Sequence, residues 1–133
     1  MINLIHLSND EKILDSLLFT GQSFYSISSV KANKEIIDKI KYIEKKIKKK
    51  INIITIVNDS IVFSDYFPEI NFSKIQAVEL DKLTYDCAVH NIKLMNKKNI
   101  EIHNTDYLKC LNFKQDVVYF DPPWGDNYKN LNL

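Results

Sequence analysis

Four short runs rich in β-branched residues alternate with helical patterns in this chain, and this alternation constrains the fold more than any other feature. The runs cover residues 51–57, 74–78, 99–103 and 117–120. Strands that alternate with helices are typical of consecutive β-α-β units, in which the strands are parallel and the crossovers right-handed. The sequence therefore predicts an α/β fold whose four strands end at one ligand-binding edge of a mainly parallel sheet.

Helical periodicity is clearest before the first strand. A short helix is expected through Leu18, capped by Ser8 or Asn9, and a longer one from Ser28 or Ser29 through Lys50. The inward face of the longer helix is predicted to carry Val30, Ile36, Ile37, Ile40, Ile43 and Ile47. We therefore expect a helical extension over residues 1–50 and a strand-containing domain over residues 51–133.

Two further helices are expected between the strands. A turn at Asn58 and Asp59 begins a short helix that Pro68 ends. Asp81 caps a helix from Lys82 to Met95, with Leu83, Cys87, Leu94 and either Val89 or His90 directed inward. The second strand leads into Glu79 just before this cap.

Composition limits the classes of function. The net charge is +1 and all 18 basic residues are lysines, so we expect only local attraction to nucleic acid and no bidentate arginine contacts. Cys87 and Cys110 lack the spacing of a zinc site or a disulfide scaffold, and three scattered histidines predict no metal centre. No secretory leader and no apolar run long enough for a membrane span is found. We expect a reducing intracellular compartment, cytoplasm or nucleus, and no membrane partner.

The residues after the last strand form a rigid, acceptor-rich turn. Asp121 is followed by Pro122, Pro123 and Trp124, and each proline holds the preceding residue in an extended conformation. An Asp121 carboxylate oxygen and the Pro122 carbonyl could accept both N–H donors of a nucleobase amino group while Trp124 stacks on the base. A plain surface turn is the alternative interpretation, because paired prolines occur there too.

This Asp-Pro-Pro-Trp sequence resembles motif IV of the class I S-adenosylmethionine-dependent amino-methyltransferases. Gly125 and Tyr128 make it most similar to the RNA cap guanine-N2 methyltransferases, the trimethylguanosine synthase group, whose pattern reads D/S-P-P-W-G-G-x-x-Y. The resemblance implies a Rossmann-like sheet of strand order 3-2-1-4, S-adenosylmethionine as cofactor and capped RNA as partner. It also implies a catalytic role for residues 121–124 and substrate binding by Trp124 and Tyr128.

Two more acids are candidate cofactor ligands. Glu79 follows its strand at the place where a dinucleotide-binding fold puts the acid that contacts ribose hydroxyls. Residues 77–81, Ala-Val-Glu-Leu-Asp, resemble motif II of the cap enzymes, and Asp106 resembles the acid of their G-D-x-L segment beside the adenine ring. Without the resemblance, Glu79 is a surface acid beside a helix cap and Asp106 a loop acid.

The chain departs from this family at the first strand and at its end. Residues 51–61 contain no glycine, so Asn58 or Asp59 would have to adopt the positive φ that lets the backbone approach the cofactor. The chain also stops soon after strand 117–120, as a domain truncated after motif IV would. That strand would form an apolar edge, for which we expect a partner chain.

Lysines at 45, 46, 48, 49 and 50 have two interpretations. They could bind RNA phosphates, or they could form a solvated helix end whose cations complement the helix dipole.

The leading functional hypothesis is methyl transfer to the exocyclic amine of a nucleobase, most like guanine N2 of an RNA cap. One alternative is a catalytically degenerate remnant that binds nucleic acid or protein. The other is an adenine amino-methyltransferase acting on DNA.

Overall fold

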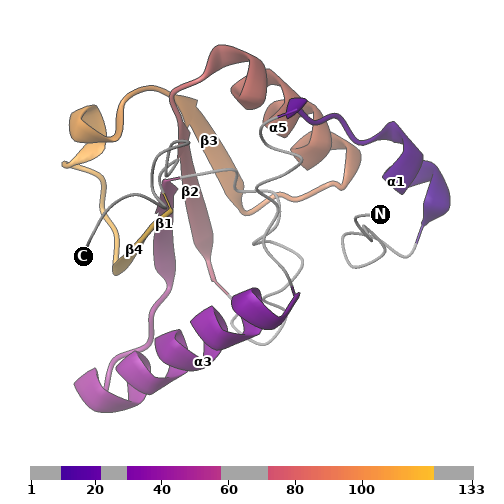
Figure 1. Ribbon diagram of the computed structural model, residues 1–133. Coiled ribbons are helices and arrows are strands. Elements are labelled where there is room, and N and C mark those ends of the chain that lie inside the picture. The colour runs from indigo at the N-terminus through magenta and orange to yellow at the C-terminus, as the bar shows by residue number, and fades with distance from the viewer. Residues whose placement is uncertain (1–9, 22–29, 58–71, 122–133) are drawn as a thin grey trace, which may run out of the picture.

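The computed structural model describes residues 10–21, 30–57 and 72–121 (Figure 1). Its elements follow the order α1 (Glu11–Ser16), α3 (Val30–Ile47), β1 (Ile53–Val57), β2 (Lys74–Glu79), α5 (Lys82–Leu94), β3 (Ile100–Asn104), the 3-10 helix η1 (Tyr107–Cys110) and β4 (Val117–Phe120). The predicted turn at 58–59 and the short helix before Pro68 lie outside the described residues.

The four strands form one parallel sheet of order β3-β2-β1-β4. This confirms the predicted α/β, Rossmann-like class and its strand order. β1 and β2 are the central strands, and Ile54, Thr55, Ile56, Gln76 and Ala77 are buried there. Crossover connections cover both faces of a parallel sheet, so the residues of its central strands are buried.

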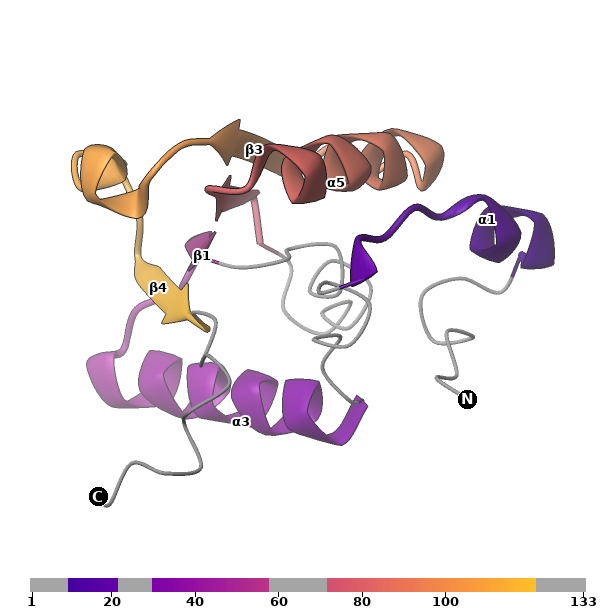
Figure 2. The same cartoon turned by 45° about the horizontal axis from the view of Figure 1, so that its top comes forward.

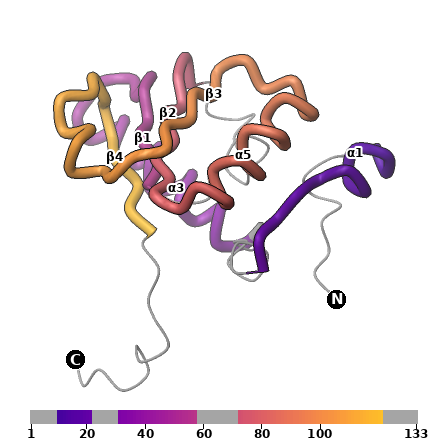
Figure 3. The backbone as a smooth tube through the Cα atoms, turned by 90° about the horizontal axis from the view of Figure 1, so that it is seen from above, coloured from indigo at the N-terminus to yellow at the C-terminus, as the bar shows by residue number. Residues whose placement is uncertain are grey.

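One face of the sheet carries the hydrophobic core. Side chains of Ile37 and Ile40 from α3 pack with Ile54, Ile56 and Ile75. α5 covers the same face farther along, where Ala88 and Ile92 pack against Ile100 and Ile102. Ile54, Ile75 and Ile100 are register partners, so their side chains share a face, and both helices pack on it. Figure 3 shows α5 at the β3 side of the sheet. α3 therefore contributes to the same core as the strands.

The opposite face has a polar centre beneath the connection from β3 to β4. The Thr55 hydroxyl donates to the Gln115 side-chain oxygen, and the Gln76 amide donates to Thr55 Oγ1 at 3.1 Å and to the Lys114 carbonyl at 3.0 Å. Farther along, the rings of His103 and Phe113 lie 4.8 Å apart. This network satisfies polar groups that the strand pattern places inside the protein.

α1 is joined to α5 through the segment that follows it (Figure 2). Leu18 N donates to Asn91 Oδ1 at 2.8 Å, and Asn91 Nδ2 donates to the Leu18 carbonyl at 2.7 Å. Asp10, not Ser8 or Asn9, is the N-cap of α1, because its carboxylate accepts a hydrogen bond from Lys12 N at 3.0 Å.

Three residues predicted to face inward are exposed instead. Leu83 has 64% of its surface exposed, while Ala88, Asn91 and Ile92 form the buried side of α5. Ile43 and Ile47 are also exposed, since α3 extends past the sheet and ends at Ile47, before the predicted Lys50. Helical spacing identifies a set of aligned side chains, but the position of the neighbouring element decides which of them it covers.

Candidate functional site

The carboxyl ends of the four strands form the candidate site. Register pairs Val57 with both Val78 and Phe120, and Glu79 with Asn104. Because the strands are parallel, the segments that follow them start at one edge of the sheet. The predicted residues Glu79, Asp106 and Asp121 all belong to this edge.

Glu79 lies half-buried at the end of β2, with its carboxylate turned toward the first turn of α5. Its Oε1 accepts a hydrogen bond from Asp81 N at 2.7 Å. Burial raises the pKa of Glu79 above its usual 4.5, and the nearby Asp81 carboxylate adds to the rise, while hydrogen bonds from Asp81 and Leu80 oppose it. The fold thus holds an acid where its charge is costly.

The segment that leads into Asp106 is hydrogen-bonded to the end of β2. The Glu79 carbonyl accepts from Thr105 N at 3.2 Å and from Asn104 Nδ2 at 2.9 Å. Asp106 itself caps η1, because its Oδ1 accepts from Leu108 N at 2.9 Å. One carboxylate oxygen is therefore engaged in shaping the turn.

Asp121 is held beside the end of β1. Its backbone N–H donates to the Val57 carbonyl at 3.4 Å, so residue 121 meets the point where the β1 strand ends. Burial raises the pKa of Tyr119, and the Asp121 carboxylate contributes to the same direction. Pro122, Pro123, Trp124, Tyr128, Asn58 and Asp59 lie outside the described residues, and their predicted roles stay predictions.

Exposed apolar side chains lie close to these acids in the sequence, and no sequence pattern identified them as site residues. Leu80 and Leu108 are 72% and 71% exposed, and Phe120 lies edge-on to the Tyr107 ring with centroids 4.5 Å apart. Their signal is positional, since Leu80 directly follows Glu79 and Leu108 lies two residues after Asp106. Apolar surfaces beside a few polar acceptors are what a flat ring such as a nucleobase requires.

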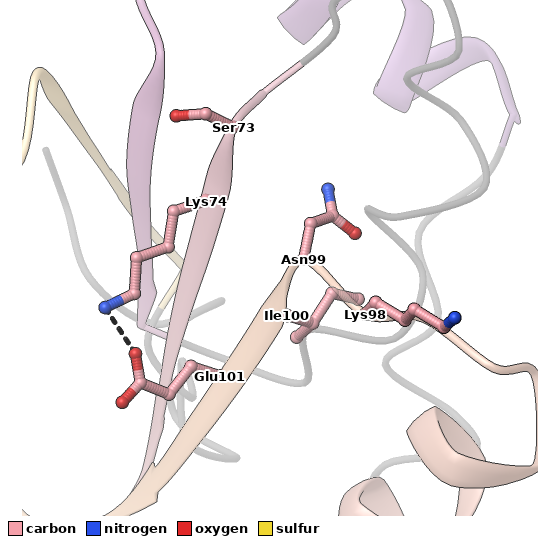
Figure 4. A pocket seen from close by; sticks show the side chains of 6 residues that line it. All are labelled: Ser73, Lys74, Lys98, Asn99, Ile100 and Glu101. Atoms are coloured by element: carbon pink, nitrogen blue, oxygen red, sulfur yellow. Dashed lines mark ion pairs between the residues drawn. The ribbon is translucent and has the colours of Figure 1, made fainter.

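A pocket of about 380 Å³ lies at the other edge of the sheet, at the amino ends of β2 and β3 (Figure 4). It is lined by Ser73, Lys74, Lys98, Asn99, Ile100 and Glu101. Lys74 and Glu101 form an ion pair there. Since none of the predicted site residues lines it, this pocket is separate from the candidate site.

The described residues lack two features, a cluster of metal ligands and a membrane-spanning helix. Within residues 10–21, 30–57 and 72–121, no three His, Cys, Asp or Glu side chains gather as a metal site would require. Of the helices described, none has both the length and the apolar character to cross a membrane. Cys87 and Cys110 form no disulfide with each other. Burial raises the pKa of the Cys110 thiol, with a smaller contribution from Asp106.

Comparison with known proteins gives one distant similarity. No protein-family model matches the chain. The chain is 35% identical over 79 residues to uncharacterized protein L320 of Acanthamoeba polyphaga mimivirus. The match covers 53% of this chain and 29% of that protein, so the chain spans less than a third of its viral relative.

Proposed function

We propose that the carboxyl edge of the sheet binds S-adenosylmethionine and a nucleobase, and that the protein methylates an exocyclic amine, most like guanine N2 of an RNA cap. One observation carries the proposal. Sheet order 3-2-1-4 gathers Glu79, Asp106 and Asp121 at one edge, with Asp121 N bonded to the end of β1.

Glu79 is suited to the cofactor's ribose. A carboxylate that is partly desolvated gains when two hydroxyl groups donate to it, because these hydrogen bonds stabilise its charged form. The pKa of Glu79 is raised, as expected for a ribose-binding acid, because the hydroxyl groups that would stabilise the charged carboxylate come with the ligand. The exposed Leu80 and Leu108 side chains then offer an apolar surface to the adenine.

Asp121 is suited to the acceptor amine. Its carboxylate and the Pro122 carbonyl would accept the two N–H groups, leaving the nitrogen lone pair directed at the methyl carbon. When bound, S-adenosylmethionine would supply a methyl group on a sulfonium, so that the N–C bond would form as the S–C bond breaks and S-adenosylhomocysteine would leave. Asp121 offsets the charge that develops on nitrogen, whose proton then passes to solvent. Alignment and charge neutralisation carry this reaction.

A degenerate remnant is the second candidate, favoured by one observation. Residues 51–61 contain no glycine to bring the backbone close to the cofactor. Such a protein would bind a cap analogue, quenching Trp124 fluorescence, without transferring a methyl group.

Calorimetry with S-adenosylhomocysteine tests the cofactor site. Glu79→Gln should weaken binding about tenfold or more, because the lost charge removes two charge-assisted hydrogen bonds. Its melting temperature should stay level or rise, since an acid with a raised pKa opposes folding at neutral pH. Glu35→Gln, an exposed change on α3, is the matched control and should bind normally. No binding by the wild type at millimolar ligand would refute the enzyme proposal.

Methyl incorporation into capped RNA, uncapped RNA and DNA tests the acceptor. Label is expected in capped RNA, and Asp121→Ala should lower the rate about a hundredfold or more through lost positioning. Labelling of DNA adenine alone would favour the DNA alternative. Cap-analogue binding without incorporation would favour the remnant.

A further inference from the structure

Charge is divided unevenly along this nearly neutral chain. Residues 31–50 contain nine of the 18 lysines and three of the 17 acids, so this segment carries +6 while the rest of the chain carries −5. A net charge of +1 therefore hides a strongly basic segment. Its field acts on a large anionic ligand within about one Debye length, roughly 8–10 Å at physiological salt.

The basic segment and the acids of the candidate site lie at opposite edges of the sheet. The carboxyl end of α3 leads into the amino end of β1 (Figure 1). Glu79 ends β2, and Asp106 and Asp121 follow the carboxyl ends of β3 and β4. Strands of five or six residues separate the two edges by roughly 16–20 Å. The Lys49 ammonium, 2.9 Å from Asp116 Oδ1, fixes the end of α3 beside the start of β4.

We propose that this end of α3 binds the phosphate backbone of a single-stranded nucleic acid. The basic rim is defined by Lys45, Lys46, Lys48 and Lys50, with Tyr42 as a stacking platform. All five side chains are exposed. The proposal goes beyond the methyltransferase function and holds whether or not a methyl group is transferred.

Among the residues that the structure describes, the acid closest to the rim in the sequence forms no ion pair with its lysines and is engaged with the backbone instead. Glu44 is the one acid between residues 39 and 50, and its Oε1 accepts a hydrogen bond from Ile51 N at 2.7 Å. Its carboxylate is thus used to join the helix to β1. Within the described residues, Lys45, Lys48 and Lys50 make no ion pair.

Two features distinguish the rim from a merely solvated helix end. Tyr42 is 60% exposed, with the Lys46 ammonium 5.6 Å from its ring centroid, so an aromatic face stands among the cations. Lys48 has a φ of 53°, a conformation that glycine or asparagine adopts more easily. A lysine at this position keeps a charge where a neutral residue would fit the backbone better.

A nucleic acid fits the rim better than a membrane surface does. A helix that lies in a membrane needs a broad apolar face to insert among the acyl chains. Most of the apolar face of α3 is occupied, because Ile37 and Ile40 are buried in the core, and the exposed Ile43 and Ile47 leave only a narrow apolar strip. Lysines around an exposed tyrosine are instead suited to a nucleic acid, because the lysines can bind the phosphates while a base stacks on the tyrosine ring. Such stacking does not depend on the base sequence.

Fluorescence anisotropy with a labelled single-stranded RNA of mixed sequence tests the proposal on the full chain. Replacing Lys45, Lys46, Lys48 and Lys50 together by glutamine should weaken binding about tenfold or more and lower the salt slope by about 3, since each phosphate contact adds about 0.7. Lys49 stays unchanged, because its pairing with Asp116 holds β4.

The matched control removes four exposed lysines elsewhere. Replacing these lysines by glutamine deletes the same charge from α1, α5 and η1 and should leave the salt slope of RNA binding nearly unchanged. The four are Lys12, Lys82, Lys93 and Lys109. Tyr42→Ala should weaken binding about fivefold or more, while Tyr42→Phe keeps it. The proposal would be overturned by an equal loss of RNA affinity in both four-lysine variants, or by a wild type that shows no salt-dependent RNA binding. Binding to phosphatidylserine vesicles but not to RNA would replace it with a membrane surface.

Discussion

Single residues show where the fold accepts a local cost. Lys48 and Asn96 have φ values of 53° and 54°, and they follow the ends of α3 and α5. Positive φ ends a helix by freeing the chain to turn, and glycine does this without a Cβ clash. Asparagine tolerates this conformation, so Lys48 is the residue of the two that is retained despite its backbone preference.

Lys48→Gly should therefore stabilise the protein. We expect the free energy of unfolding to rise by about 1 kcal/mol, because glycine relieves the left-handed strain. Lys45→Gly, inside the same helix, should lower it by about 1 kcal/mol instead. Urea denaturation of both variants measures the difference. A Lys48→Gly protein no more stable than Lys45→Gly would mean that position 48 is not strained.

At the scale of elements, one buried amide joins two distant parts of the chain. Asn91 is fully buried in α5, and its side chain pairs with both the N–H and the carbonyl of Leu18. The same junction includes the His90 ring nitrogen, 3.0 Å from the Ser16 carbonyl. These bonds attach the N-terminal helix to the sheet domain.

Replacing this amide should loosen the junction. Asn91→Ala is expected to cost about 1–3 kcal/mol, because the Leu18 N–H and carbonyl lose partners in a partly buried place. Asn112→Ala, in an exposed turn, should cost almost nothing. Thermal melts give the cost, and hydrogen exchange at Leu18 should speed up in the first variant alone. Unchanged exchange at Leu18 would show that other contacts hold the segment.

For the whole molecule, Asp116 joins three elements at the amino edge of the sheet. Its Oδ2 accepts from Asn52 N at 2.9 Å and Ile53 N at 3.0 Å, and its Oδ1 accepts from Lys49 at 2.9 Å. The Lys49 ammonium first, and then the two backbone N–H groups, lower the pKa of Asp116 from 3.8 to about 2. The strand at the edge, β4, depends on this carboxylate.

Lowering the pH should remove the stabilisation that the Asp116 carboxylate provides, over a defined pH range. A lowered pKa stabilises the fold fully above the unfolded value of 3.8, and the gain disappears as the pH falls toward about 2. Asp116→Asn should thus be less stable than the wild type at neutral pH, with a difference that shrinks across this range. Urea midpoints measured against pH test it, with the exposed Asp38→Asn as control. A difference independent of pH would mean that the charge of Asp116 contributes nothing.

Sequence by itself determined the fold class of this protein. The β-branched runs at 74–78 and 117–120 and the Asp81 cap identified β2, β4 and α5 to within one residue, because alternation and capping are local properties. The positions of Glu79 and Asp121 at the carboxyl ends of β2 and β4 were likewise predicted from the sequence, and their functional roles stay predictions. Local patterns of this kind persist in the folded chain.

Tertiary structure alone decided which side chains meet. It buried Asn91 and left Leu83 and Ile47 exposed, since burial depends on where the neighbouring helix or strand ends. It joined Lys49 to Asp116 and Gln76 to Lys114, pairs separated by 67 and 38 residues, respectively, for which no periodicity gives a signal. It also placed a basic rim and an acidic edge at opposite ends of one sheet, because parallel strands send all their carboxyl ends one way.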